Sequence, residues 1–339
     1  MLYATVLEGN VRSQVVPVAH SAWGLYLLHR IDRAAVSSPE FGCGSLSSTT
    51  RADVRRPFPE TVGEPRSNRL GELISRRTGL TLLFVITVAV IAVDFFLPRI
   101  PQPQAYHHFA DQRGFLGIPN FGDVVSNLPF ALFGLWGLAF WQRCNSGQNP
   151  GTFIDRRERW PYLLVFVGML LTAFGSSYYH LEPNNARLVW DRLPMTIAFM
   201  SIVAAVIAER ISVRAGLWLL PILLLVGISS VLQWYLSEQR GEGDLRFYGT
   251  VQAYSILFLL IALLLRPRYT RSADLAIVAG FYVLAKALEA LDKPIFALGN
   301  VVSGHTLKHL AAALAGYWVL RMLQKRRPLS GLSPASSVA

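Results

Sequence analysis

From Leu80 onward the chain alternates long apolar segments with short polar loops, and this pattern limits the possible fold more than any other feature. A helix needs about 20 apolar residues to cross the hydrocarbon core of a bilayer. Several segments carry proline, which membrane helices tolerate better than exposed soluble ones. The candidate spans lie at about 80–98, 122–141, 161–180, 188–208, 215–236, 247–265, 272–291 and 304–323. The sequence therefore predicts an all-α integral membrane protein with eight transmembrane helices.

The composition agrees with a membrane protein. Of the 339 residues, 52% are hydrophobic and 16% are charged, whereas a soluble domain carries about 25% charged residues. The net charge of +11 does not imply nucleic-acid binding, because Arg-rich cytoplasmic loops give the same excess, and the chain has no nucleic-acid motif. Cys43 and Cys144 are too few for a disulfide framework and lack the spacing of metal ligands.

Basic residues alternate between the loops and indicate the orientation. They precede the first span and follow the second, fourth, sixth and eighth, whereas the other loops are poorer in Arg and Lys. By the positive-inside rule both termini are cytoplasmic. We therefore expect a multi-pass protein of the plasma (inner) membrane.

The chain divides into four predicted parts. Residues 1–76 mix short apolar runs with Ser, Pro and Arg, and we interpret them as a disordered tail or a mis-assigned start rather than a functional domain. An extra N-terminal transmembrane helix follows at 77–100. Residues 101–324 are predicted to form a seven-helix domain, and 325–339 a cytoplasmic C-terminal tail.

Two histidines open the last apolar segment. His305 and His309 are four residues apart, so on a helix they share one face. Such a pair can bind one metal ion. On its own, the pair is as consistent with a packed polar helix face as with two metal ligands. It could also bind haem.

The predicted topology brings further polar residues to the same depth. His180 ends the third span and Asp191 lies in the first turn of the fourth, so both are near the outer face with His305 and His309. Ser176 shares a helix face with His180. Ionisable groups at membrane depth are candidates for a functional site. Alternatives are that His180 is an interfacial residue and that Asp191 forms a local ion pair with Arg192.

Together these residues predict a catalytic metal site. Three histidines with an open position are typical of catalytic zinc, which is the cofactor that we expect. Asp191 could orient or deprotonate the attacking water, and Ser176 could donate a hydrogen bond to the developing oxyanion.

The ordered set Ser176-x-x-x-His180, Asp191 and His305-x-x-x-His309 resembles the alkaline ceramidase family, with features of a bacterial-type member. That family belongs to a superfamily of seven-helix membrane hydrolases that includes adiponectin-receptor-like proteins. The stretch from Asp123 to Leu128 is similar to the family's first core helix. The resemblance covers about residues 105–323.

The resemblance implies a zinc-dependent amidase that hydrolyses the N-acyl amide of a ceramide-like membrane lipid, so the expected partner is a lipid. It implies that zinc binds His180, His305 and His309, that Asp191 activates water, and that Ser176 stabilises the tetrahedral intermediate. The alternative function is a non-enzymatic membrane receptor or transporter with a structural metal.

The segment before the first core helix departs from the family. Eukaryotic members carry an acidic calcium site there, but Asp111 is the only acid between residues 105 and 120, so we do not expect a calcium site of that kind. Asp111, Arg113 and Asn120 are predicted instead to shape a substrate entrance. His107 and His108 are predicted to be solvated interfacial residues.

Other polar and aromatic residues receive no catalytic role. Lys286 and Glu289 are three apart and are predicted to pair with each other. Four aromatic residues are predicted to lie in the interfacial belt, namely Trp160, Trp190, Trp234 and Tyr248.

Overall fold

The computed structural model describes residues 75–329, which all belong to one unit, Gly63–Ala339. Nearly all of the predicted tail 1–76 and most of the predicted C-terminal tail 325–339 lie outside the described residues. Within residues 75–329 the regular elements are all helical. The all-α prediction is therefore confirmed for the part of the chain that the structure describes.

Eight long helices coincide with the eight predicted segments. They are α1 (Arg76–Phe96), α3 (Leu128–Asn145), α4 (Arg159–Leu181), α5 (Asn185–Arg210), α6 (Val213–Gln239), α7 (Arg246–Ala262), α8 (Asp274–Ala290) and α10 (Gly304–Lys325). Four short helices lie between them, namely η2 (Gln104–His107), α2 (Phe121–Val125), η3 (Arg156–Glu158) and α9 (Asp292–Ala297).

Five stretches of the described chain are long and apolar enough to cross a membrane. They are Arg77–Phe96, Phe121–Asn145, Arg156–Leu181, Asn185–Arg210 and Val213–Gln239. Helix α7 is apolar but shorter, and α8 has 17 residues. Residues 75–329 thus contain five candidate membrane spans, while the count of eight crossings and the cytoplasmic termini stay predictions.

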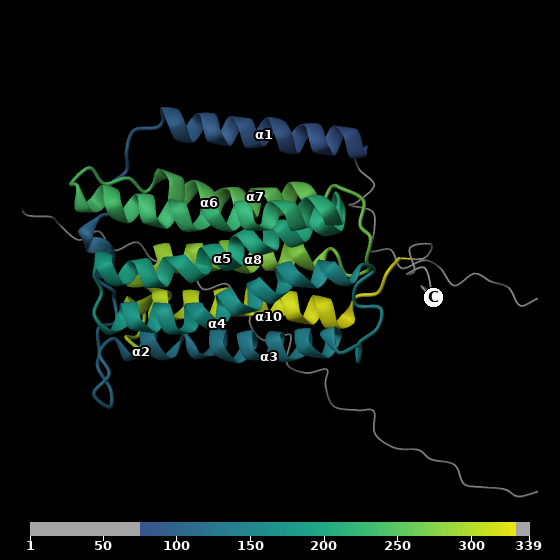
Figure 1. Cartoon of the computed structure of the whole chain (residues 1–339). Coiled ribbons are helices and arrows are strands. Elements are labelled where there is room, and N and C mark those ends of the chain that lie inside the picture. Colours follow the sequence, from purple (N-terminus) through teal and green to yellow (C-terminus); the bar gives the residue numbers. More distant parts are fainter. Residues whose placement is uncertain (1–74, 330–339) are drawn as a thin grey trace, which may run out of the picture. The chain divides into compact units, whose positions relative to one another are not determined.

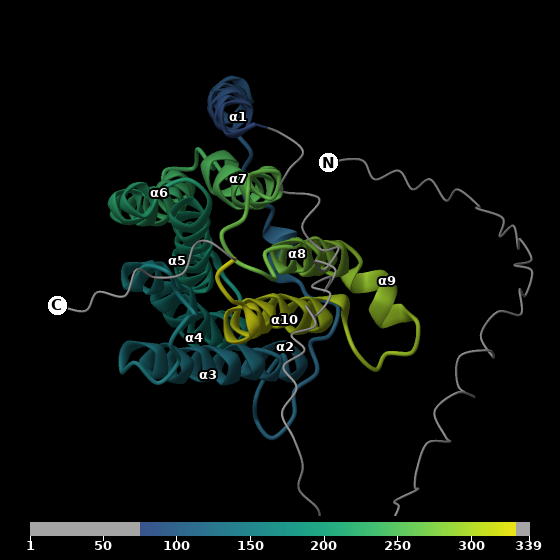
Figure 2. The same cartoon turned by 90° about the vertical axis from the view of Figure 1, so that its right-hand side faces the viewer.

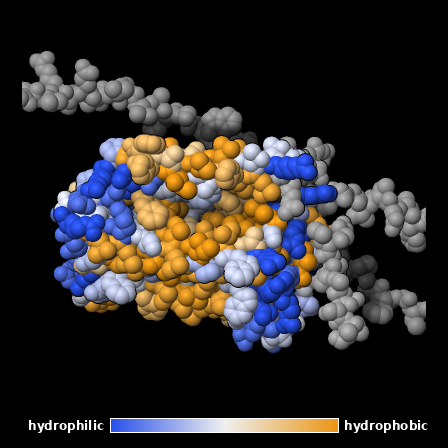
Figure 3. Space-filling view, turned by 45° about the horizontal axis from the view of Figure 1, so that its top comes forward, coloured by the Kyte–Doolittle hydropathy of each residue, from blue (hydrophilic) through white to orange (hydrophobic). Residues whose placement is uncertain are grey.

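Six helices form a closed ring. In the order α3, α4, α5, α7, α8 and α10, each helix contacts the next, and α10 contacts α3 (Figures 1 and 2). Helix α6 packs outside the ring on α5 and α7, and α1 packs on α7. The face in Figure 3 carries a broad apolar band between two polar ends, as expected of a surface in contact with lipid.

Glycine allows α4 and α5 to approach each other closely. A Cβ atom on Gly175 would lie 2.0 Å from the carbonyl oxygen of Trp190, and one on Gly168 would lie 2.8 Å from the backbone nitrogen of Ala198. Small residues at such crossings let helix backbones come together. The contact places the C-terminal end of α4 beside the N-terminal end of α5.

The start of α10 is fixed by a serine cap and a close contact with α8. The Oγ of Ser303 accepts a hydrogen bond from the backbone N–H of Thr306 at 3.0 Å, which is a common N-cap interaction. A Cβ atom on Gly304 would lie 2.3 Å from the carbonyl oxygen of Leu288. The first turn of α10 is therefore held against the C-terminal end of α8.

Candidate metal centre

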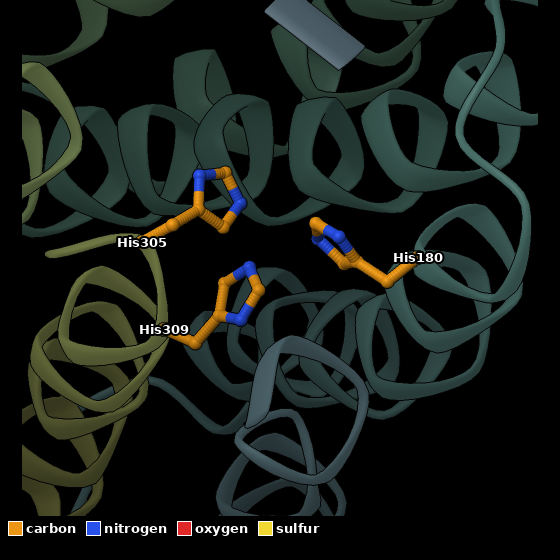
Figure 4. Close-up of side chains that lie close together, drawn as sticks. All are labelled: His180, His305 and His309. Atoms are coloured by element: carbon orange, nitrogen blue, oxygen red, sulfur yellow. The ribbon is translucent and has the colours of Figure 1, made fainter. Parts of the chain in front are cut away.

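Three histidines meet where the C-terminal end of α4 and the first turns of α10 come together. The rings of His180, His305 and His309 point toward one another (Figure 4). Their centroids are 4.9 Å apart in each pair, and one ring nitrogen of each lies within 4.8 Å of the others. Each residue is at most 3% exposed. The three residues predicted as ligands are thus brought together and could hold a metal ion.

The ring nitrogens of His180 give a test of whether this cluster suits a metal. Both are buried, and neither has a hydrogen-bond partner among the described residues. An unpaired buried polar group costs free energy, and a neutral imidazole nitrogen is a common metal ligand. One type of catalytic zinc site has three histidines as its protein ligands. The residues present therefore fit a zinc ion, although they do not identify the metal.

Neighbouring groups fix the positions of the three rings. Asn120 donates a hydrogen bond to the backbone carbonyl of His180 at 2.8 Å. The backbone N–H of His305 donates to Asp292 Oδ1 at 2.8 Å. The ring of Phe109 lies against both histidines, with centroid distances of 4.7 Å to His180 and 4.4 Å to His305. The cluster is therefore held by the 98–120 loop and α9 as well as by its own helices.

Asp191 and Ser176 lie together across the contact between α4 and α5. The side chain of Ser176 lies beside the Asp191 carboxylate, and the two residues are 1% and 7% exposed. Both line the same cavity as His309. Within residues 75–329, Asp191 forms no ion pair with Arg192, so the structure does not support the alternative of a local pair.

Protein-family models and curated proteins were both compared with the chain. Neither comparison finds a match. The resemblance to alkaline ceramidases therefore rests on the residues and their spacing alone.

An apolar cavity of about 390 Å³ occupies the ring of helices. All six helices of the ring contribute to its wall. Apolar side chains such as Met169 and Phe199 line most of it, while Ser176, Asp191 and His309 contribute polar atoms. A mostly apolar pocket with a few convergent polar groups is the usual form of a small-molecule site.

An ion pair between α8 and α10 also lines this cavity. Lys308 Nζ lies 2.8 Å from Glu289 Oε1 and 3.3 Å from His305 Nε2. Glu289 also pairs with Lys286, as predicted, and accepts a hydrogen bond from the Tyr106 hydroxyl at 3.1 Å. Sequence reasoning missed Lys308, although a lysine between two histidines in an apolar helix was a signal that it faces the interior.

Two aromatic residues assigned to the interfacial belt are instead buried. Trp234 is 0% and Tyr248 is 6% exposed, whereas Trp160 and Trp190 are 44% and 58% exposed. The belt prediction is therefore wrong for Trp234 and Tyr248. Both pack on the buried guanidinium of Arg192, so their aromatic faces are used inside the protein.

The predicted entrance residues connect loops around the metal centre. Arg113 donates to both carboxylate oxygens of Asp111, and also to the carbonyl oxygens of Asn300 and Val301. Its guanidinium lowers the pKa of Asp111. None of Asp111, Arg113 and Asn120 is among the residues that line the cavity. Their role at a substrate entrance stays a prediction.

His107 differs from the prediction of a solvated residue. Its ring nitrogens lie 2.9 Å from the Tyr179 hydroxyl and 2.9 Å from Asn185 Oδ1. The side chain is half-buried, and desolvation lowers its pKa. His108, by contrast, is exposed. His107 therefore ties the η2 helix to α4 and α5.

Proposed function

We propose that the protein is a zinc-dependent amidase of the alkaline ceramidase type. It hydrolyses the N-acyl amide bond of a ceramide-like membrane lipid to a fatty acid and a sphingoid or related amine. One observation carries the proposal: the three-histidine cluster lies near Ser176 and Asp191, which line an apolar cavity together with His309.

The chemistry divides between the metal and the protein side chains. A bound zinc ion would act as a Lewis acid and lower the pKa of water. Asp191 would accept the proton of the attacking water and return one to the leaving nitrogen. Ser176 would donate its hydroxyl hydrogen to the developing oxyanion. The apolar wall of the cavity would hold the acyl chain.

The proposal includes a seven-helix core within residues 101–324 and one added helix at 77–100. Helical segments at all eight predicted positions support this count. Both α1 and α6 lie outside the ring, but α6 packs on α5 and α7 whereas α1 packs on α7, which supports α1 being the addition to the core. The distribution of Arg and Lys supports cytoplasmic termini, with the metal centre toward the outer face of the plasma membrane.

The first test is hydrolysis of a panel of N-acyl lipids by the purified protein, with and without a chelator. We expect fatty-acid release that the chelator abolishes and zinc restores. His305→Ala is expected to lose both bound zinc and hydrolysis. A His305→Ala protein with full zinc content and undiminished hydrolysis would contradict the ligand assignment.

A second variant separates an amidase from a receptor or transporter with a structural metal. Asp191→Asn is expected to retain zinc and to lose hydrolysis by about 100-fold or more, the usual contribution of a general base. Asp94→Asn on α1 is the matched control, because Asp94 accepts a hydrogen bond from Thr250 of α7 and does not line the cavity. Unchanged hydrolysis in Asp191→Asn would remove the proposed base.

A further inference from the structure

One cationic side chain in the cavity wall lacks a partner for part of its hydrogen-bonding capacity. Arg192 lines the cavity beside Asp191 and is 5% exposed. Its Nη2 donates to Gln102 Oε1 at 2.7 Å, whereas its Nη1 is buried without a hydrogen-bond partner. A guanidinium is always charged and has five donors. An unsatisfied donor on a buried cation is costly, so an acceptor at this position would stabilise the protein.

Aromatic rings hold the charge of Arg192 in place. Its Cζ lies 4.1 Å from the ring centroid of Trp234, 4.6 Å from that of Tyr248 and 5.8 Å from that of Tyr106. Such cation–π contacts offset part of the cost of burying the guanidinium. They leave Nη1 without a hydrogen bond, and no carboxylate within residues 75–329 lies at ion-pair distance from Arg192.

The charges around the cavity leave a positive excess. Its wall has three cationic side chains, Arg192, Lys286 and Lys308, and two carboxylates, Asp191 and Glu289. Glu289 pairs with both lysines, and neither carboxylate of the wall forms an ion pair with Arg192. The wall therefore has a net charge of +1, which a ligand with one negative charge would balance.

We propose that Arg192 binds a carboxylate on the amine part of the lipid, so that the substrate is an anionic N-acyl amino acid lipid. This inference rests on the proposed amidase function, and it replaces the ceramide-like substrate by an N-acyl lipid whose amine part carries a carboxylate. A guanidinium matches a carboxylate through directed, charge-assisted hydrogen bonds. Because Asp191 and Arg192 line the same cavity, Arg192 can hold a carboxylate near the amide on which Asp191 acts.

The test compares ligands that differ in the carboxylate alone. Binding of radiolabelled N-lauroylglycine and N-lauroylethanolamine to the full-length detergent-solubilised protein is measured with a chelator present, so that neither metal nor hydrolysis contributes. The wild type is expected to bind N-lauroylglycine about 10-fold or more tightly than the neutral amide, the effect of one charge-assisted hydrogen bond. In Arg192→Gln this ratio falls to about 1.

Three further arms locate the effect at Arg192. Arg187→Gln is the matched control, because Arg187 is also at the start of α5 but pairs with Glu182 and does not line the cavity; it is expected to keep the ratio. Arg192→Lys retains the positive charge but not the planar guanidinium, and it is expected to keep only part of the affinity ratio. This variant still tests the inference if Arg192→Gln fails to fold. Lauric acid tests whether Arg192 binds the product carboxylate instead.

The outcomes separate this inference from the proposed function. The carboxylate subsite would be overturned if the wild type bound both amides with equal affinity, or if the affinity ratio were unchanged in Arg192→Gln or Arg192→Lys. It would also be overturned if Arg192→Gln weakened the binding of lauric acid as much as that of N-lauroylglycine. In that case hydrolysis of neutral amides could still support the amidase. Conversely, an Arg192-dependent binding ratio without hydrolysis of any amide by the zinc-loaded protein would support the subsite and count against the amidase.

Discussion

The Oγ atom of Ser126 lies 2.8 Å from Nδ1 of His309. The same hydroxyl donates a hydrogen bond to the backbone carbonyl of Asp123 at 3.1 Å. A hydroxyl has one hydrogen to donate, so Ser126 accepts the hydrogen carried by Nδ1. His309 is thereby held in the tautomer whose Nε2 lone pair is free for a metal. A residue outside the ligand set thus fixes the chemical state of a ligand.

Ser126→Ala is expected to weaken zinc binding by about 10- to 100-fold, because partners that orient a ligating histidine usually contribute that much. Zinc affinity is measured by competition with a chromophoric chelator. Ser177→Ala is the control, since Ser177 donates to the Val124 carbonyl and, within residues 75–329, forms no hydrogen bond with the three histidines. Equal zinc affinities for the two variants would show that Ser126 has no orienting role.

The common depth of the three histidines could be predicted from the sequence because it depends on the direction of the helices. Arginine and lysine in the loops set the direction of each span, and direction sets which helix ends lie at one depth. His180 at the end of α4 and His305 at the start of α10 follow from that rule. The spacing of four residues then brings His309 onto the same face as His305.

The partners of Lys308, Arg192 and Trp234 could not be predicted in this way. They depend on how each helix is rotated about its axis and on which helices are neighbours in the ring. A membrane helix that is apolar on all sides gives little sign of its inward face. The aromatic belt rule therefore failed for Trp234, because the packing of α6 on α5 buries a residue at interfacial depth.

The ion pair between Glu289 and Lys308 is mostly buried, with side chains 14% and 15% exposed. Glu289→Gln would leave Lys308 without its carboxylate beside the cavity. Breaking such a pair from one side costs about 3–5 kcal/mol, so we expect a clear fall in the thermal unfolding midpoint in detergent. Lys286→Met is the control, since Lys286 also pairs with Glu289 but is 52% exposed.

The two variants are expected to lower the unfolding midpoint by different amounts. Lys286→Met is expected to change the unfolding midpoint little, because exposed ion pairs contribute about 0–1 kcal/mol. If both variants lowered the unfolding midpoint equally, Glu289 would stabilise the fold through Lys286. The contact between Glu289 and Lys308 would then contribute nothing further.

Gly175→Ala tests the close contact between α4 and α5. The added Cβ atom would meet the Trp190 carbonyl oxygen at 2.0 Å, so the helices must move apart. Overpacking of this kind costs about 1–3 kcal/mol, and we expect lower hydrolysis because Ser176 and Asp191 separate. Gly280→Ala on α8 is the control, since no atom lies within 4 Å of its added Cβ; there alanine is expected to stabilise the helix by about 0.5–1 kcal/mol.

Both Gly175→Ala and Gly280→Ala are assayed for unfolding midpoint and lipid-amide hydrolysis. A Gly175→Ala protein that keeps both at wild-type values would show that the α4–α5 approach is looser than the structure has it. A loss of stability without loss of hydrolysis would contradict the role given to the Ser176–Asp191 contact.

The pair between Asp111 and Arg113 should make stability depend on pH. Arg113 Nε and Nη2 each donate to the Asp111 carboxylate at 2.7 Å and lower its pKa. A carboxyl group with a lowered folded-state pKa stabilises the fold at pH values above its unfolded pKa, about 3.9. That contribution is lost as the pH falls through the lower folded-state value. The difference in unfolding midpoint between wild type and Arg113→Gln is therefore expected to be largest near pH 7 and to narrow below about pH 4.

The difference in unfolding midpoint between wild type and Arg113→Gln would not disappear at low pH. Arg113 also donates to the carbonyl oxygens of Asn300 and Val301 at 2.7 and 2.9 Å. Those bonds connect the Asp111 loop to the segment that leads into α10, and they do not titrate in this range. Arg240→Gln is the control, since Arg240 pairs with Glu242 at an exposed position and is expected to change the midpoint little at any pH. A difference for Arg113→Gln that stays constant from pH 7 to pH 3 would mean that these carbonyl contacts, and not the charge of Asp111, account for the contribution of Arg113.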